Sequence, residues 1–314
     1  MSINSEIIKK EYEHLQDKHR LELIENKFKL YEKYPELEKI DKELKELKTK
    51  KAICKINQNE EDIDKINKLI ELKNIEKIEF LDKNRINNDI FNIKYDCNDC
   101  KDTGFVNNKK CHCYIDKEIE LIKKKSNLPN LFYNYTFDNL DLKCFDQDIK
   151  VTDDLKYQDY MKIVMSDIAE KVKDIAIGKS VFILFYGPTG SGKTYLSSCI
   201  ANSSINKLKT TFYISAADYI NSFFLKQFDE SSIYDEYELL ILDDLGMETI
   251  SEFSVGKIFE LINNRINKNL SLIISTSCSL NELNDIYGES TVSRIFNKFY
   301  IVKLNGEDLR RIKK

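Results

Sequence analysis

Apolar residues recur at helical spacing along residues 1–93, between short blocks of Lys and Glu. Four leucines lie seven residues apart, and this repeat is typical of an amphipathic helical hairpin or a short coiled coil; they are Leu23, Leu30, Leu37 and Leu44. Residues 1–93 contain no glycine and one proline, Pro35, which we expect to break or start a helix. Residues 57–62 are expected to form a turn.

A different pattern begins near Ser180. Apolar runs of about five residues alternate with helical segments, and a periodic helix is predicted just before them, over 154–177. The runs read VFILFY, TFYIS, LLILDD, LSLIIST and a weaker FYIVKL. Continuous apolar strands separated by helices predict an α/β fold with a five-stranded parallel sheet between helices.

The chain is therefore expected to have four parts. Residues 1–93 form a helical region whose apolar stripes either pack internally or dock on a partner helix, and residues 94–125 form a small cysteine module. An irregular, aromatic-rich linker spans 126–150, and residues 151–314 form the α/β domain.

Composition narrows the classes of function. The net charge of −4, from 49 basic and 53 acidic residues, does not indicate a nucleic-acid-binding protein. The sequence has no run of about 18 apolar residues and no signal peptide, so we expect a cytoplasmic protein with no membrane segment. In that compartment, cysteines are expected to be metal ligands or buried thiols and not disulfides.

Glycine is scarce, and its distribution points to a site. Three of the nine glycines lie within residues 187–194, after an apolar run and before a helical segment. This is the pattern G-x-x-x-x-G-K-[ST], in which backbone N–H groups surround phosphate. Lys193 is expected to neutralise phosphate charge, and the Thr194 hydroxyl to coordinate Mg²⁺. The predicted nucleotide-binding residues are Gly187, Pro188, Thr189, Gly190, Ser191, Gly192, Lys193, Thr194 and Tyr195.

An acidic pair supports this interpretation. Asp243 and Asp244 directly follow the apolar run 239–242, and two carboxylates at the end of a buried strand need a partner. A magnesium ion held by Asp243 supplies one, while Asp244 is expected to polarise the attacking water. A glycine-rich turn that binds no nucleotide is the alternative, and the acidic pair disfavours it.

Residues 97–113 contain four cysteines, in the order C-x₂-C, ten residues, C-x-C. A hairpin with Asn107 and Asn108 at its tip would bring the second pair back to the first. The spacing predicts one structural zinc ion, with His112 as an alternative ligand; the expected ligands are Cys97, Cys100, Cys111 and Cys113. Ordinary thiols or a redox pair are the alternative. The other four cysteines are expected to be structural; they are Cys54, Cys144, Cys199 and Cys278.

Together, the glycine motif, the acidic pair and the later run IISTS resemble the AAA+ ATPases. The segments LLILDDLG and SRIFNKFYIVKLNGEDLRR more narrowly resemble the DnaC/DnaI-type replicative helicase loaders and the related IstB transposition helper ATPases. The resemblance covers about residues 130–314. It extends to the cysteine module for DnaI-type loaders, whose N-terminal domain carries zinc.

The resemblance assigns further roles. Ser277 occupies the sensor 1 position, where the family usually has Asn, and serine has a shorter reach and fewer donors. Arg294 matches the arginine finger, which acts on ATP held by a neighbouring subunit. Arg310 matches a sensor-2-like arginine that contacts the nucleotide, and no C-terminal lid domain is expected. For each arginine, an ordinary solvated charge is the alternative.

The resemblance also implies partners: a hexameric replicative helicase, single-stranded DNA and further copies of the chain. DNA binding is expected to be weak and salt-sensitive. Its candidate helix is 215–228, where the aromatic residues are equally compatible with a core position; the candidates are Tyr219, Phe223, Phe224 and Lys226. The functional alternatives are an IstB-like transposition helper and a nucleotide-binding adaptor with little hydrolysis.

Overall fold

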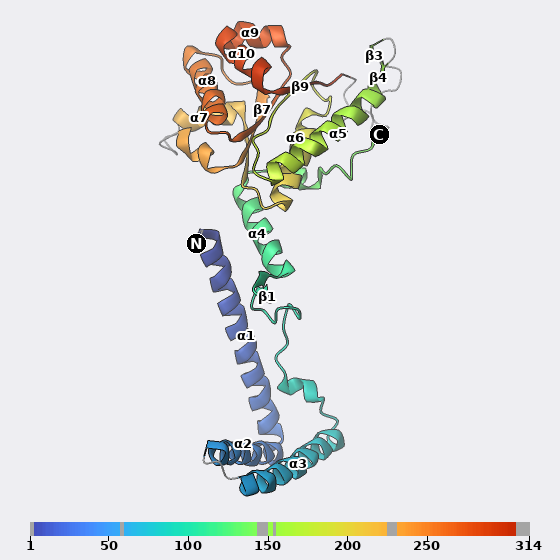
Figure 1. Cartoon of the computed structure of the whole chain (residues 1–314), viewed down its shortest axis with the longest axis vertical. Helices are drawn as coiled ribbons and strands as arrows, with labels where there is room; N and C mark the ends of the chain where they lie inside the picture. Colours follow the sequence, from blue (N-terminus) through green and yellow to red (C-terminus); the bar gives the residue numbers. More distant parts are fainter. Residues whose placement is uncertain (1–2, 57–59, 143–149, 153–154, 225–230, 306–314) are drawn as a thin grey trace. The chain divides into compact units, whose positions relative to one another are not determined.

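The computed structural model describes residues 3–56, 60–142, 150–152, 155–224 and 231–305. The chain forms two compact units, Met1–Ile115 and Asp116–Lys314, and each is described by itself. Figure 1 shows long helices in the first unit and a sheet between helices in the second. The four-part domain division drawn from the sequence stays a prediction.

The first unit is built on three helices: α1 (Ile3–Lys33), α2 (Pro35–Ile56) and α3 (Glu60–Lys83). Proline suits the first turn of a helix because its missing N–H would have no partner there, and α2 begins at Pro35. The leucine repeat therefore continues across two helices. Leu30 of α1, Leu37 of α2 and Leu81 of α3 form one small core.

The last three residues of the turn expected over 57–62 are helical. Residues 57–59 lie outside the described residues, and α3 already begins at Glu60. Its first turn contains Glu60, Glu61 and Asp62. Carboxylates are favourable beside the free N–H groups at a helix N-terminus, so this acidic run starts the helix.

The cysteine module follows a short helical turn, η1 (Asn88–Phe91). Strands β1 (Phe105–Val106) and β2 (Lys109–Lys110) pair antiparallel, and α4 (His112–Lys125) begins directly after them. Asn107 and Asn108 both have positive φ, 50° and 62°. Asparagine tolerates this conformation, which a two-residue hairpin turn requires.

The second unit contains the five-stranded sheet predicted from the sequence, with all neighbouring strands parallel. Its order is β6-β7-β8-β5-β9. The strands are β5 (Phe182–Tyr186), β6 (Thr211–Ser215), β7 (Leu239–Leu245), β8 (Ser271–Thr276) and β9 (Tyr300–Lys303). Strand β8 lies between β5, which precedes the glycine motif, and β7, which carries the acidic pair.

Helices cover both faces of this sheet (Figure 1). One face packs on α5 (Tyr157–Ala176) and α6 (Lys193–Asn206). The other face packs on α7 (Ala216–Phe224), α8 (Glu252–Asn267), α9 (Leu280–Tyr287) and α10 (Glu289–Lys298). Successive strand residues alternate between the two cores, which explains why the strands are apolar without interruption. Shorter elements are η2 (Asn130–Asn134), β3 (Lys150–Thr152), β4 (Leu155–Lys156) and η4 (Ser231–Glu236).

A buried arginine fixes one end of the sheet. Arg265 of α8 has no exposed surface. Its guanidinium donates to the carbonyl oxygens of Tyr234 and Tyr237 at 2.8 Å and of Ser271 at 2.5 Å. Burial lowers the pKa of Arg265 to about 10. These bonds join α8 to the starts of β7 and β8.

Within the described residues, no helix has the length and apolar character needed to span a bilayer.

Candidate nucleotide site and cysteine module

The glycine motif forms a loop between β5 and α6. Gly187, Gly190 and Gly192 have positive φ values of 146°, 83° and 97°. At Gly187 a Cβ atom would lie 2.0 Å from the carbonyl oxygen of Leu304, so only glycine fits. Helix α6 begins at Lys193, directly after this loop, and the N-terminus of a helix presents backbone N–H groups and a positive potential to an anion.

Lys193 is buried, and its side chain turns back over this loop. Its Nζ donates to the carbonyl oxygens of Gly187 at 2.7 Å and Pro188 at 2.8 Å. The ammonium is thereby held at the centre of the loop, where it can neutralise phosphate charge.

The predicted magnesium ligands lie together. The Thr194 hydroxyl at the start of α6 donates to Asp243 Oδ2 at 3.0 Å, although the two residues are 49 positions apart. Asp243 is 2% exposed. Its carboxylate also accepts hydrogen bonds from the Tyr213 hydroxyl at 2.5 Å and from the Ser275 hydroxyl. A hydroxyl and a carboxylate are hard oxygen ligands, so their chemistry fits Mg²⁺.

Asp244 points the other way because the strand is irregular there. The register between β7 and β8 shifts between Leu242 and Leu245. Asp244 has φ +55° and is exposed, while its N–H donates to Ser275 Oγ at 3.0 Å. A left-handed residue at a strand end is a feature found at functional sites. One acid is thus buried beside Thr194 and the next is accessible to water.

Arg294 lies on α10. Its Nε donates to Asn263 Oδ1 at 3.0 Å and its Nη1 to the Ser290 carbonyl at 2.8 Å. The guanidinium carbon lies 4.6 Å from the centroid of the Phe259 ring. These three contacts are with residues of α8 and α10, and none of them is with the glycine loop of the same chain.

The remaining predicted nucleotide-site residues have different placements. Ser277 follows the end of β8 and is half-buried. Tyr195 lies on α6, where its hydroxyl donates to the Thr136 carbonyl at 3.2 Å and its ring centroid lies 4.6 Å from that of Tyr135. Arg310 is outside the described residues.

The aromatic DNA-binding candidates are not equivalent. Tyr219 is completely buried in the core, and Phe223 packs against that core. A role for Tyr219 in a DNA groove is therefore wrong, because its ring belongs to the packing between α7 and the sheet. Phe224 is 68% exposed, so its ring remains a candidate for contact with DNA bases. Lys226 lies outside the described residues.

The four cysteine thiols converge in the first unit. Cys97 Sγ lies 3.8 Å from Cys111 Sγ, and Cys100 Sγ lies 3.5 Å from Cys113 Sγ. Tetrahedral zinc with bonds of about 2.3 Å separates its sulfur ligands by about 3.8 Å, so the donor set fits this ion. A second set, which includes His112, is also close enough to share a metal: Cys97, Asp99, Cys111 and His112.

Backbone N–H groups donate hydrogen bonds to two of these thiols, Cys97 and Cys100. A hydrogen bond from the Cys100 backbone lowers the pKa of Cys97 to about 7. The N–H of Gly104 points at Cys100 Sγ, 3.4 Å away. Gly104 has φ +77°, and a Cβ atom there would lie 2.8 Å from the Tyr12 ring and 2.9 Å from the Tyr114 ring.

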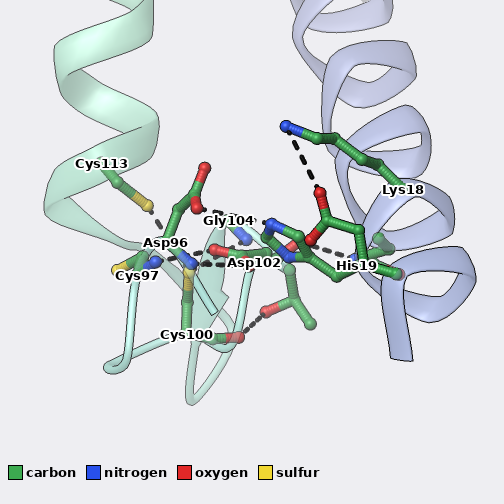
Figure 2. A network of polar contacts seen from close by, with 11 residues as sticks. Lys18, His19, Asp96, Cys97, Cys100, Asp102, Gly104 and Cys113 are labelled. Atoms are coloured by element: carbon green, nitrogen blue, oxygen red, sulfur yellow. Dashed lines mark hydrogen bonds and ion pairs between the residues drawn. The ribbon is translucent and has the colours of Figure 1, made fainter. Parts of the chain in front are cut away.

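One face of α1 supports the module through residues that sequence reasoning missed (Figure 2). The Tyr12 hydroxyl donates to Cys113 Sγ at 3.0 Å, and Gln16 Nε2 donates to the Asp102 carbonyl at 2.7 Å. His19 Nδ1 lies 3.1 Å from the buried Asp102 carboxylate. Positions 12, 16 and 19 lie on one helix face. This spacing of uncharged polar and aromatic residues is the sequence feature that could have indicated a contact with the module.

Asp102 connects that face to the cysteine loop. Its carboxylate accepts hydrogen bonds from the N–H of Cys97 at 2.8 Å and of Asp96 at 3.0 Å. Asp102 is 1% exposed, and His19 is 6% exposed. Figure 2 shows the imidazole of His19 reaching from α1 toward Asp102 and Asp96.

Comparison with known proteins shows which family the chain resembles. One relative, an ATP-binding protein of insertion sequence IS5376 from Geobacillus stearothermophilus, is 24% identical over 208 residues, which cover 62% of this chain and 76% of the relative. The replicative helicase loader DnaC of Escherichia coli K12 is 25% identical over 126 residues, or 38% of this chain and about half (51%) of the loader.

A crystal structure of the DnaC helicase loader aligns with 56% of this chain and all of that chain, at 22% identity and a TM-score of 0.44. The family described as IstB-like ATP binding protein matches residues 144–314, more than half of the chain. The glycine loop and the acidic pair fall inside this match. The chain belongs to the IstB-like ATP-binding protein family.

Proposed function

We propose that this protein is an ATP-dependent loader of a hexameric replicative helicase, active in the cytoplasm at the initiation of DNA replication. The observation that carries the choice of loader is the four-cysteine module, which contacts Tyr12 of α1 through Cys113 and Gln16 and His19 of α1 through Asp102. Such a module resembles that of DnaI-type loaders and adds to an ATP-binding domain a separate unit for partner binding.

The helical surface of the first unit supports a partner role. Leu21, Ile24 and Phe28 of α1 are each at least 60% exposed and follow a helical spacing. Exposed apolar residues in a row on one helix face are typical of a docking surface for a partner helix. We assign this face to the helicase.

A binding experiment tests the proposal. Full-length protein with ATP and Mg²⁺ is mixed with a purified hexameric replicative helicase or with a transposase of the insertion-sequence type. We expect capture of the helicase and loss of capture in Ile24→Ser. Glu25→Ser changes a neighbouring exposed residue and is the matched control. Capture of the transposase alone would overturn the loader proposal.

ATP chemistry follows from the geometry of the second unit. Lys193 and the N-terminus of α6 bind the phosphates, Thr194 and Asp243 hold Mg²⁺, and exposed Asp244 polarises the attacking water. Arg294 acts on the ATP of a neighbouring copy, so hydrolysis is slow until copies assemble through the ATP site. Ser277 contacts the γ-phosphate or the water with a single hydroxyl.

Single-stranded DNA is the weakest of the proposed partners. Phe224 stays exposed on α7 and lies 5.2 Å, between ring centroids, from Phe253 of α8, which is also exposed. Exposed aromatic rings stack on bases without sequence preference. DNA binding that is unchanged in Phe224→Ala would contradict this assignment.

A second function is favoured by the insertion-sequence relative: a helper ATPase for a transposase. The third is an adaptor that binds ATP without turnover, and single-turnover hydrolysis with and without helicase separates it from the loader. Hydrolysis that stays negligible in both conditions would favour the adaptor.

A further inference from the structure

Asp243 is held from both neighbouring strands of the sheet. Ser275 donates to its carboxylate from β8, and Tyr213 donates to Oδ2 from β6, at 2.5 Å. β7 lies between these two strands. The family motifs quoted from the sequence include no residue of β6, so the contribution of Tyr213 is visible only in the structure.

The sheet register explains how Tyr213 reaches the acid. Tyr213 pairs with Ile241, two residues before Asp243, and side chains two apart on a strand share a face. The long phenol ring spans the remaining step along the strand. Asp243, Thr194 and Tyr213 therefore meet on the face covered by α6.

The position of the Tyr213 ring is fixed independently of the acid. Its centroid lies 5.7 Å from that of Phe132 in an edge-to-face contact. Its backbone N–H donates to the Ser126 carbonyl at 2.8 Å, and its carbonyl accepts from Asn127 Nδ2 at 2.8 Å. A phenol keeps its proton at neutral pH and a carboxylate only accepts, so the Tyr213 hydroxyl is the donor in this bond.

Thr194 and Tyr213 contact the same carboxylate oxygen, Oδ2. In the proposed ATP site, Thr194 is also a magnesium ligand. When its hydroxyl oxygen binds the ion, Tyr213 and Ser275 remain to orient the carboxylate. Hydrogen-bond donors to a metal-binding carboxylate fix its direction, and loss of such a donor typically lowers metal affinity by about 10- to 100-fold.

We propose that Tyr213 is a positioning residue for magnesium in the ATP site, which holds Asp243 through Oδ2 so that the carboxylate faces the ion. This inference rests on the proposed binding of ATP with Mg²⁺. It assigns to β6 a part in metal binding in addition to its part in the sheet.

The chain offers a matched control. The Tyr300 hydroxyl of β9 donates to Asp167 at 2.5 Å, the same distance as in the Tyr213–Asp243 pair. β9 and β6 are the two edge strands of the sheet. Tyr300→Phe therefore removes an equivalent tyrosine–aspartate bond at the other edge, where Tyr300 pairs with Ile183, four residues before Gly187.

The experiment measures binding of a fluorescent ATP analogue to the full-length protein as MgCl₂ is increased, and separately in EDTA. For Tyr213→Phe we expect the half-saturating Mg²⁺ concentration to rise about tenfold. Affinity in EDTA and thermal melting should stay close to wild type. Tyr300→Phe should leave the Mg²⁺ dependence unchanged.

Three outcomes would overturn the inference. One is a Mg²⁺ midpoint for Tyr213→Phe within about twofold of wild type, well below the expected effect. Another is an equal shift in Tyr213→Phe and Tyr300→Phe, which would indicate a general loss of stability. The third is an absence of analogue binding by the wild-type protein, which would overturn the proposed ATP site itself and is thus distinguishable from the first two.

Discussion

Thr194 and Asp243 are joined by a hydrogen bond of 3.0 Å between the Thr194 hydroxyl and Asp243 Oδ2. Thr194 lies in the first turn of α6, which begins at Lys193. Asp243 lies on β7, where the register with β8 shifts, and β8 separates β7 from β5 in the sheet. The first residue follows the phosphate-binding loop and the second is the buried acid. Their contact therefore places the phosphate and magnesium ends of one site next to each other.

Lys193→Ala is expected to abolish ATP binding. The ammonium is held inside the loop by two carbonyl oxygens, and its loss removes the cationic partner of the phosphates. We expect affinity to fall at least about 100-fold, or about 3 kcal/mol. Isothermal titration calorimetry with ATP and Mg²⁺ measures this fall. Lys179→Ala, which changes an exposed lysine paired with Asp174, should bind normally.

Arg294→Ala is expected to leave ATP binding intact and to reduce hydrolysis in the assembled protein by about 10³-fold. The reason is that its guanidinium contacts Asn263, Ser290 and Phe259, and none of these residues belongs to the glycine loop of its own chain. Phosphate release under assembling conditions measures the effect.

Mixing two variants shows on which subunit the arginine acts. A Lys193→Ala subunit binds no ATP but still offers Arg294 to a neighbour whose own Arg294 is alanine. Mixed assemblies of the two variants should regain part of the activity that each lacks alone. No recovery in the mixture would count against action between subunits.

The cysteine module is expected to hold about one zinc ion per chain. Metal analysis of protein purified without chelator measures this stoichiometry, and Cys113→Ser should lower it. Cys199→Ser is the control, because Cys199 is buried in the second unit. Among the described residues, Cys199 belongs to neither of the two groups of side chains that lie close enough to share a metal ion. A stoichiometry near zero in the wild-type protein would contradict the prediction.

Gly104→Ala is expected to destabilise the cysteine module by more than the strain of a positive φ alone, which is about 1 kcal/mol. The added Cβ would overlap the Tyr12 and Tyr114 rings. Gly178→Ala is the matched control, because Gly178, in the turn after α5, also has a positive φ, +85°, and nothing within 4 Å of the added atom. Thermal unfolding and zinc retention should therefore be lower in Gly104→Ala. Equal unfolding losses in the two variants would show that the rings move aside without cost.

The sequence by itself determined the parts of this protein that depend on local spacing. Glycines are needed where φ is positive and where a strand meets a helix start, so the phosphate loop was visible as a motif. Uninterrupted apolar strands indicated a sheet buried on both faces, and the segment FVNNKKC predicted the hairpin at Asn107–Asn108. Each of these features is set by residues close together in the chain.

Tertiary structure decided which distant residues meet. Tyr213 joins Asp243 because β6 and β7 pair in one register, and Tyr12 joins Cys113 across 101 positions because a face of α1 packs on the module. The burial of Tyr219 in the core was decided in the same way, by the packing of α7 on the sheet. A tyrosine in a helix or strand has the same local pattern whether it lies in a core or in a site, so only packing distinguishes the two.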